Sequence, residues 1–530
     1  MTSVRRAALG AWLALLLLPN ISTVPLAGAW DGPRWQLVAV SLWMAVCAWA
    51  VVPRRLFLVL TYPLVVAGLA IVGADFLRSA NLLELLAVAY TFREAEIRNV
   101  VAPYVGAAAL VAAVMLALLV YLWRGERGEP MRRGFAAGVV LFGLLMVVVL
   151  PARSWRDAWP VALASAVLEG QAGSGGIDLP SLANVSASPR NRFESWQAHR
   201  EHGPGYAETY VLVIGESVRS DRVPGCGGRP QVAPPPDGSI LYCDVVSGSS
   251  STHTSVPLLV SRDLPGSRER VSRDATMLKA FEAAGFETFW LAVQERLIAW
   301  PDAQNQAYHP APGLDRDVLL PLLDKALATP VPRKLIVLHA YNAHSPYRDR
   351  YRAATAPFPV DALDGATWRP RAQTGGDARW NDYDNAIDES MRFLREIADR
   401  LRSQQGAAFM VFTPDHGENM RDDARNLTDH ALKLPTLWDT RVPAVFWANG
   451  TWREANPDRW LMLSRNVAAP LMHMDLVPTM LGAADIRYTE RRAEPVDMTA
   501  RIAPPRARFT QVRAGEIVTL DELRRQAQPR

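Results

Sequence analysis

Lysine, internal repeats and excess charge are all scarce in this sequence of 530 residues. Only four of the 57 basic residues are lysine, and we attribute the arginine excess to genome composition rather than to specific recognition. The formal net charge is only +4 and no basic stripe is present, which excludes the usual electrostatic footprint of a nucleic-acid-binding protein. We therefore expect no nucleic-acid partner.

Cysteine occurs at only three positions. Cys47 lies in an apolar stretch, whereas Cys226 and Cys243 lie on either side of a loop that is rich in proline and glycine. In an oxidising compartment this pair is expected to form a disulfide, and two free thiols are the alternative.

Charged residues are missing from five long apolar stretches in the first part of the chain. Each stretch is close to the roughly 20 residues that a helix needs to cross a bilayer. The stretches are Leu9–Ala29, Gln36–Val52, Leu56–Ala74, Val101–Trp123 and Gly134–Leu150. They predict an N-terminal bundle of five transmembrane helices. Their lack of ionisable groups argues against an ion pump or transporter, while a carrier of neutral solutes stays open.

Arginine clusters fix the expected orientation of this bundle. The clusters precede the first stretch, separate the second from the third and separate the fourth from the fifth, so the positive-inside rule places all of them in the cytoplasm. They consist of Arg5, Arg6, Arg54, Arg55, Arg124, Arg127, Arg132 and Arg133. We expect a multi-pass protein of a bacterial inner membrane whose remainder lies in the periplasm. The first stretch also resembles a cleavable signal peptide, but its length favours retention.

Composition shifts divide the rest of the chain. The segment 77–100 predicts a helix at the outer membrane interface, which serves either as an anchor or as a lip for a lipid head group. A stretch rich in glycine, serine and proline follows the fifth apolar stretch and predicts a linker. The expected parts are a transmembrane domain 1–152, a periplasmic linker 153–205, a catalytic domain 206–490 and a C-terminal extension 491–530.

Apolar strands and helical stretches alternate from about Tyr206. Strands are expected near 210–214, 287–292, 335–339, 408–413 and 443–447. Helices are expected at Ala275–Ala284, Val318–Ala328, Asp382–Gln404 and His473–Leu481. This alternation predicts an α/β domain with a mainly parallel sheet and helices on both faces.

Three of the expected strands end in residues that bind metals or carry out catalysis. Glu216 follows the strand expected near 210–214. His339 and His344 lie at and beyond the end of the strand near 335–339, and Asp415 with His416 follows the strand near 408–413. Ligand sites in open α/β sheets lie beyond the carboxyl ends of the strands, so these side chains are expected to meet. Each residue alone has an ordinary alternative as part of a turn, a solvated surface or the core.

A segment rich in serine and threonine, Ser247–Pro257, supplies a further candidate, Thr252. The candidate metal ligands are then Glu216, Thr252, Asp415 and His416. Their carboxylate, imidazole and hydroxyl donors suit zinc, with manganese as the alternative. A divalent ion lowers the pKa of a hydroxyl that it coordinates, which makes Thr252 the candidate nucleophile. The adjacent serines leave this register open.

The motifs, taken in order, resemble the membrane phosphoethanolamine transferases of the alkaline phosphatase and sulfatase superfamily. The resemblance rests on Gly215-Glu216-Ser217-Val218-Arg219, on Thr252 five residues before Pro257, and on Asp415-His416-Gly417-Glu418. That family includes enzymes that modify lipid A. The resemblance covers most of the chain and implies a sulfatase-like fold for the C-terminal α/β domain.

The resemblance also implies roles for individual residues. It implies zinc ligation by Glu216, Thr252, Asp415 and His416. It implies catalytic roles for Thr252, which would become phosphorylated, for His344 at the phosphoryl group, and for His430 as a second histidine. It implies that the ethanolamine head group is held by Thr91 and Glu94.

Two departures from the family pattern stand out, and the second of them leaves the acceptor open. A disulfide often flanks the nucleophile segment of the family, but the corresponding positions here are Gly248 and Leu258. Many lipid A enzymes carry a basic residue just after a tryptophan in the preceding strand, and Trp290–Gln294 replaces it here. The acceptor could accordingly be lipid A, a core sugar, a periplasmic glucan or another glycan.

The implied function is transfer of phosphoethanolamine from phosphatidylethanolamine to a periplasmic or outer-leaflet glycan or lipid, through an intermediate on Thr252. The enzyme would be membrane-embedded, and we expect a monomer. The nearest alternative is a phosphoglycerol transferase of the same superfamily. From a different class, a non-catalytic membrane scaffold or sensor with a degenerate site is the other alternative.

Overall fold

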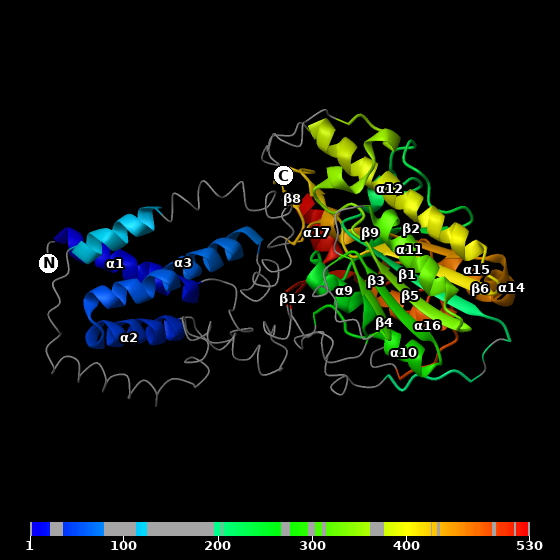
Figure 1. The fold of residues 1–530 in the computed structure, drawn as a ribbon, viewed down its shortest axis with the longest axis horizontal. Helices are drawn as coiled ribbons and strands as arrows, with labels where there is room; N and C mark the ends of the chain where they lie inside the picture. Colours follow the sequence, from blue (N-terminus) through cyan, green and yellow to red (C-terminus); the bar gives the residue numbers. More distant parts are fainter. Residues whose placement is uncertain are drawn as a thin grey trace. The chain divides into compact units, whose positions relative to one another are not determined.

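The computed structural model describes residues 3–21, 35–78, 113–124, 196–201, 203, 205–266, 276–294, 303–309, 314–360, 376–425, 427–431, 435–489, 494–513 and 516–527. The chain divides into two compact units, Met1–Val185 and Ser186–Arg530 (Figure 1). The finer division into transmembrane domain, linker, catalytic domain and extension stays a prediction.

The described part of the first unit is almost entirely helical. It comprises α1 (Ser3–Leu17), η1 (Leu18–Ile21), α2 (Trp35–Val51), α3 (Arg54–Arg78) and a helical stretch at 113–124. Helix is thus found within four of the five expected stretches, and the fifth, Gly134–Leu150, lies outside the described residues. Within the ranges given above, no helix combines the length and the apolarity that crossing a membrane requires.

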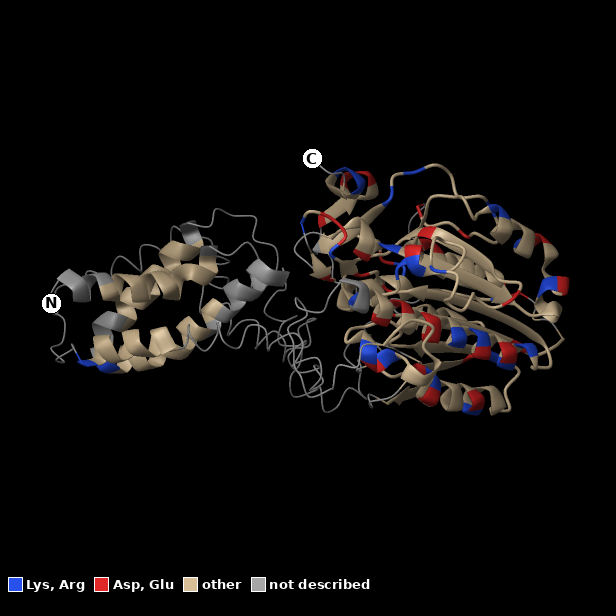
Figure 2. Ribbon diagram, turned by 90° about the horizontal axis from the view of Figure 1, so that it is seen from above, with Lys and Arg blue, Asp and Glu red and all other residues tan. Residues whose placement is uncertain are grey.

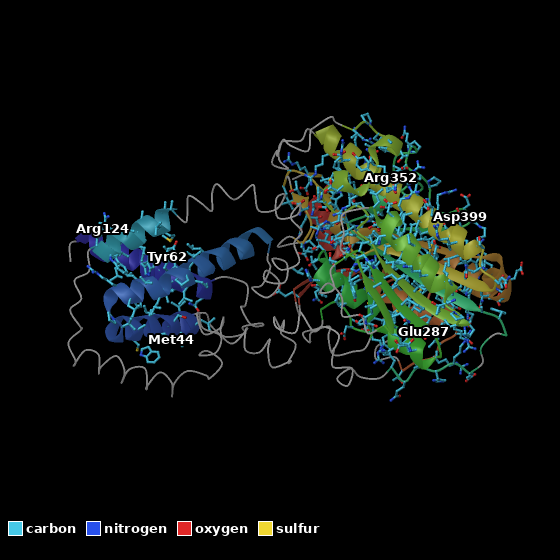
Figure 3. The ribbon with its side chains drawn as sticks, viewed as in Figure 1. Met44, Tyr62, Arg124, Glu287, Arg352 and Asp399 are labelled. Atoms are coloured by element: carbon cyan, nitrogen blue, oxygen red, sulfur yellow. A yellow bond between two sulfur atoms is a disulfide. The ribbon has the colours of Figure 1, made fainter. Side chains whose placement is uncertain are left out.

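Apolar contacts hold the helices of this unit together. Trp12 of α1 donates a hydrogen bond to Thr61 Oγ1 at 3.0 Å and stacks against Tyr62 of α3. Figure 3 labels Tyr62 among the side chains of this unit. Phe57 and Leu58 are buried in the same cluster. Figure 2 shows these helices almost bare of charged residues, whereas the helices of the second unit carry both signs.

An eight-stranded sheet forms the centre of the second unit, in the order β10-β2-β9-β6-β1-β5-β3-β4 (Figure 1). All neighbouring strands are parallel except the pairs that β9 makes with β2 and β6. The strands are β1 (Glu208–Gly215), β2 (Ile240–Val246), β3 (Glu287–Ala292), β4 (Asn305–Tyr308), β5 (Arg333–His339), β6 (Ala407–Pro414), β9 (Arg441–Ala448) and β10 (Leu471–Met472). The expected α/β domain with a mainly parallel sheet is confirmed.

Buried side chains cover both faces of this sheet. In β1, Tyr210, Leu212 and Ile214 join one core, while Val211 and Val213 join the other, because successive side chains of a strand point to opposite faces. The first core is completed by α9 (Thr252–Val260), α10 (Met277–Ala283), α14 (Gly450–Ala455), α15 (Pro457–Arg465) and α16 (Leu476–Ala483). The second is completed by α11 (Asp315–Ala328) and α12 (Gly376–Arg402).

All five expected strands and all four expected helices are present; the strand at 287–292 has the expected bounds, and the other elements have shifted ends. The helix expected from His473 begins at Leu476, because His473–Asp475 forms the 3-10 turn η7. Elements that the sequence left unassigned include β2, β4, β10 and, near the C-terminus, β11 (Phe509–Arg513), β12 (Glu516–Thr519) and α17 (Leu520–Ala527). Shorter elements are η3 (Ser220–Arg222), η4 (Tyr347–Arg350), η5 (Ala353–Thr355), β7 (Asn419–Met420), β8 (Thr428–Asp429) and α13 (Leu437–Thr440).

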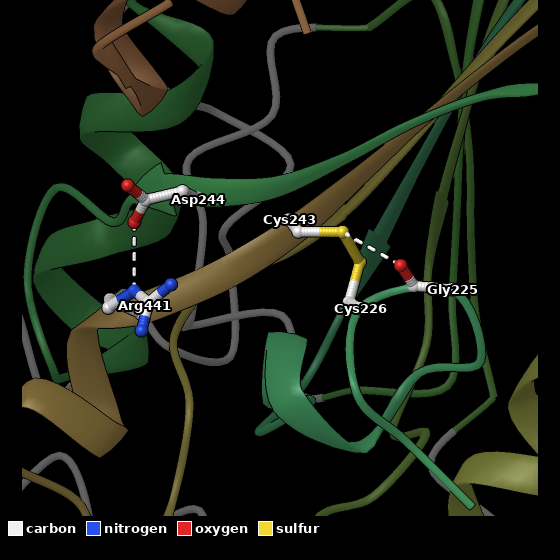
Figure 4. Close-up of a disulfide and its surroundings, with 5 residues drawn as sticks. All are labelled: Gly225, Cys226, Cys243, Asp244 and Arg441. Atoms are coloured by element: carbon white, nitrogen blue, oxygen red, sulfur yellow. Dashed lines mark hydrogen bonds and ion pairs between the residues drawn. A yellow bond between two sulfur atoms is a disulfide. The ribbon is translucent and has the colours of Figure 1, made fainter. Parts of the chain in front are cut away.

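Cys226 and Cys243 form a disulfide, with their Cα atoms 5.3 Å apart (Figure 4). The alternative of two free thiols is therefore wrong for this structure. The bridge ties the loop after η3 to β2. The next residue of β2, Asp244, accepts a hydrogen bond from Arg441 Nε of β9 at 2.8 Å, so the same stretch is also fastened to its neighbouring strand.

Candidate active site

The carboxyl ends of β1, β5 and β6 lie side by side and set the position of the site. Their register pairs Ile214 with His339 and Gly215 with Pro414, so the residues after each strand emerge at one edge. Gly215 has no room for a side chain, since a Cβ there would lie 2.5 Å from Asn342 Oδ1. The backbone N–H of Asp415 donates to Gly215 O at 2.9 Å, which continues the pairing of β1 with β6 to the edge of the sheet.

Thr252 is the first residue of α9, and its hydroxyl reaches the ends of β1 and β6. Its Oγ1 lies 3.0 Å and 3.2 Å from the two carboxylate oxygens of Glu216 and 3.1 Å from His416 Nε2. His416 Nε2 in turn lies 3.1 Å from Glu216 Oε1 and 3.4 Å from Asp415 Oδ2. The structure therefore brings the four candidate ligands together, and their roles stay predictions.

The chemistry of this cluster fits a divalent cation. Glu216 and Asp415 are at most 1% exposed, so two carboxylates share one buried site. Within the described part of the chain, Asp415 Oδ2 has no hydrogen-bond partner beyond the long 3.4 Å contact with His416 Nε2, which is costly for a buried oxygen unless an ion or a proton satisfies it. Among the described residues, ligand atoms of Glu216, His416 and His430 lie within 4.8 Å of one another. Nitrogen and oxygen donors of this kind suit zinc.

Burial and mutual charge shift the pKa values of the cluster in opposite directions. Burial raises the pKa of Glu216, but the hydrogen bond and charge of His416 hold it well below its ordinary value. Burial, with the negative charge of Glu216, raises the pKa of Asp415 to about 8. Burial disfavours the imidazolium of His416, yet Asp415 and Glu216 raise its pKa to about 10. A cation bound here would compete with these protons, so binding would release them.

His430 and His344 lie beside the cluster, and their catalytic roles stay predictions. The ring of His430 is centred 4.1 Å from that of His416 and 5.7 Å from that of His344. His430 Nδ1 lies 3.1 Å from Glu418 Oε2. The candidate head-group residues Thr91 and Glu94 lie outside the described residues.

Sequence reasoning missed two buried partners of these residues. Gln294, two residues beyond β3, donates its Nε2 to Glu216 Oε2 at 2.8 Å and to Ala340 O at 2.9 Å. Glu418 is fully buried against His430. Glu418 carried a usable signal, because it belongs to the Asp-His-Gly-Glu motif. Gln294 follows a strand that neighbours β5, but its residue type gave no signal of its own.

His339 also lies at this edge but in an apolar setting. It is 1% exposed and packs edge-on against the ring of Trp290 at 5.8 Å. Burial lowers the pKa of His339 to about 4, so the imidazole is neutral. Gly248 and Leu258, where the family pattern calls for a disulfide, are in contact: a Cβ on Gly248 would lie 3.2 Å from Leu258 Cδ1.

Residues 208–486 match the Sulfatase family, and the chain belongs to that family. Among curated relatives, phosphoethanolamine transferase CptA of Salmonella typhimurium is 24% identical over 313 residues, which cover 54% of this chain and 53% of that protein. The chain thus spans about half the length of the curated relatives it matches. The resemblance to the phosphoethanolamine transferases is confirmed by these relatives.

Solved structures share the fold at low identity. The integral membrane protein lipooligosaccharide phosphoethanolamine transferase A (EptA) of Neisseria meningitidis superposes with a TM-score of 0.63 and 18% identity, over 93% of this chain and 99% of that one. A zinc complex of the C-terminal periplasmic domain of EptC from Escherichia coli gives a TM-score of 0.52 and 20% identity, over 62% and 97%. At this identity the likeness shows the fold.

Proposed function

We propose that this protein transfers phosphoethanolamine from phosphatidylethanolamine to a glycan or glycolipid acceptor through a covalent intermediate on Thr252. The observation that carries the proposal is the position of Thr252 Oγ1, within 3.0–3.2 Å of Glu216 and His416 at the start of α9. The names of the relatives support the transferred group, and the lipooligosaccharide enzyme with the same fold supports a glycolipid acceptor.

The first half-reaction would form a bond between Thr252 Oγ1 and phosphorus. The bond from phosphorus to the glycerol oxygen breaks, and as diacylglycerol leaves that oxygen takes up a proton, which balances the proton that the Thr252 hydroxyl gives up. A divalent cation held by Glu216, Thr252, Asp415 and His416 would lower the pKa of the hydroxyl and offset negative charge on the phosphoryl group. His344, beside His430, would donate to a phosphoryl oxygen as charge builds there.

The second half-reaction would return Thr252 to its free form. An acceptor hydroxyl or phosphate oxygen forms the new bond to phosphorus while the bond to Thr252 breaks. In the tautomer of His430 whose Nδ1–H donates a hydrogen bond to Glu418, the other ring nitrogen, Nε2, carries no proton and can accept one. His430 would then remove the acceptor proton, and the Thr252 oxygen regains one.

Membrane placement forms part of the proposal. The five apolar stretches would anchor the enzyme in the bacterial inner membrane with its catalytic domain in the periplasm, so that lipid donor and active site share a surface. Thr91 and Glu94 would hold the ethanolamine head group there.

Intact-mass analysis of the purified full chain tests this proposal. Zinc-loaded protein incubated with phosphatidylethanolamine is expected to gain the mass of one phosphoethanolamine group, located on Thr252 by peptide mapping. The adduct should be absent in Thr252→Ala and after removal of the metal with a chelator. A phosphoglycerol adduct formed from phosphatidylglycerol would favour the alternative transferase. An active enzyme that forms no adduct would refute the covalent step.

A further inference from the structure

The segment that carries Thr252 into the site, Ser247–Ser251, is held by parts of the chain far away in sequence. This nucleophile segment has no regular structure of its own beyond an isolated bridge, so its position depends on outside contacts. On one side, Gly248 N donates to His473 Nδ1 at 3.4 Å. On another, Ala431 N donates to Ser250 O at 2.8 Å, which links the segment to the turn of His430.

The third support comes from the C-terminal hairpin, β11 and β12, which lies outside the part of the chain that matches the Sulfatase family. Gln511 of β11 pairs with Ser249 as in a parallel sheet. Its backbone N–H donates to Gly248 O at 2.8 Å, and its carbonyl accepts from Ser249 Oγ at 3.1 Å. Its side-chain Oε1 accepts from Gly266 N at 2.9 Å, beyond the far end of α9.

The hairpin is itself fastened firmly enough to act as a support. Arg508 donates to the backbone carbonyl and to the carboxylate of Asp244 at 2.6 Å and 2.7 Å. Leu520, which follows β12, is 2% exposed and packs in a cluster with Val246 and Met472, from the two outermost strands on that side of the sheet. Gln511 is 5% exposed, so its hydrogen bonds are shielded from water.

We infer that the C-terminal hairpin is a positioning element of the active site, and that Gln511 fixes the nucleophile segment so that the Thr252 hydroxyl meets Glu216 and His416. The inference rests on the proposed role of Thr252 as nucleophile. Gln511 and Ser249 touch no reacting atom in this scheme and act only through the segment. A displacement of about 1 Å at a reacting group can reduce a rate by about 100-fold, so even a small loss of support is measurable.

Two variants of the full chain remove the support in different ways. Gln511→Pro deletes the backbone donor to Gly248, and Ser249→Ala deletes the hydroxyl that reaches Gln511. We expect the rate of Thr252 modification in a single turnover to fall about 10- to 100-fold in Gln511→Pro and about 3- to 10-fold in Ser249→Ala. The KM for the lipid should change less than twofold, because no contact to the donor is removed. Ser249→Thr keeps the hydroxyl and should restore the rate.

Matched comparisons separate positioning from general destabilisation. Ser261→Ala removes another buried serine hydroxyl, at the opposite end of α9, where it accepts from Asp263 N. Its modification rate should stay within twofold of the wild type. Gln511→Ala keeps both backbone contacts and loses only the bond to Gly266, so its rate should lie between those of the wild type and Gln511→Pro.

Hydrogen exchange gives a readout that does not depend on the proposed reaction. Amides of 247–255 should exchange faster in Gln511→Pro and Ser249→Ala than in the wild type, while amides of β1 and β6 keep their protection. If the wild type forms no adduct, the proposed function fails, and exchange alone decides the inference. Unchanged exchange in a folded Ser249→Ala protein, or wild-type modification rates in both variants, would overturn it. If Gln511→Pro does not fold, the Ser249 series decides.

Discussion

Gln294 shows how a residue that touches no reacting group can shape the candidate metal site. Its amide donates both to Glu216 Oε2 and to Ala340 O, so the carboxylate is held while its other oxygen faces Thr252 and His416. Loss of a partner that orients a metal ligand typically costs 10- to 100-fold in metal affinity. We therefore expect Gln294→Leu to bind zinc about 10- to 100-fold more weakly, measured by competition with a chromophoric chelator.

Gln306→Leu is the matched control for that measurement. Gln306 lies in β4, and its amide donates to Ala303 O rather than to a residue of the site. Its zinc affinity should equal that of the wild type. If Gln294→Leu also binds zinc as tightly as the wild type, Gln294 does not orient Glu216.

His473 predicts a loss of stability in mild acid. Its Nδ1 accepts from Gly248 N, and its Nε2 lies 3.1 Å from Thr413 Oγ1, an arrangement that suits the neutral ring. Burial lowers the pKa of His473 to about 3, below that of an unfolded histidine. In mild acid the unfolded chain therefore binds a proton that the folded chain excludes. As the pH is lowered below about 6.5, the free energy of unfolding decreases by about 1.4 kcal/mol per pH unit.

Replacing this histidine should flatten that dependence. Between pH 7 and pH 5, His473→Gln is expected to lose about 2 kcal/mol less free energy of unfolding than the wild type, measured by urea denaturation at both pH values. The variant can be less stable overall, so the comparison concerns the difference between the two pH values. Parallel losses in both proteins would contradict the assignment.

Residues of the site could be predicted where a strand end and a reactive side chain coincide. Glu216, Asp415 and His416 met this condition, and the order of the motifs added Thr252. Gln294 and His473 did not stand out, because a glutamine after a strand is usually solvated and a histidine in an apolar helix is usually core. Their roles appear only when β3 and η7 are placed beside the nucleophile segment and Glu216.

At the scale of elements, the disulfide restrains a long loop. Cys226 and Cys243 are 17 residues apart, and the loop between them is rich in proline and glycine and leads into β2. A bridge that closes a loop of this size lowers the entropy of the unfolded chain and stabilises the fold by about 3 kcal/mol. We expect the double variant Cys226→Ser, Cys243→Ser to lose about that much free energy of unfolding in urea.

Cys47→Ser provides the control, because Cys47 is a free cysteine in α2 of the other unit. It should leave unfolding of the second unit unchanged. An unfolding free energy of the double variant within about 0.5 kcal/mol of the wild type would show that the loop is ordered without the bridge.

Helices and strands could be predicted from the sequence where their apolar residues follow a clear pattern over enough positions. β1, β5 and β6 are buried on both faces, and their continuous apolar runs identify them. β10 has two residues and β4 has four, too few for any pattern to show. The antiparallel direction of β9 could not be predicted either, because a strand's own residues do not encode which way its neighbour runs. The C-terminal hairpin was hidden by a composition rich in arginine and proline.

At the scale of the whole molecule, the described hydrophobic clusters each belong to one unit. The clusters around the central sheet lie within Ser186–Arg530, and the cluster around Trp12 lies within Met1–Val185. A unit with its own core is expected to fold alone. The separate second unit should therefore melt at the same temperature as it does in the full chain and bind zinc with the same affinity.

Activity should separate from folding in this fragment. If the first unit anchors the enzyme next to its lipid donor, residues 186–530 alone lose the gain that comes from sharing a surface with the substrate. We expect at least a 100-fold lower rate of Thr252 modification with phosphatidylethanolamine in vesicles. With a short-chain phosphatidylethanolamine dissolved below its micelle concentration, the rate should stay within about threefold of the full chain. Thr252→Ala in both forms sets the background. Equal rates on vesicles would show that the first unit serves another purpose than delivery of the donor lipid.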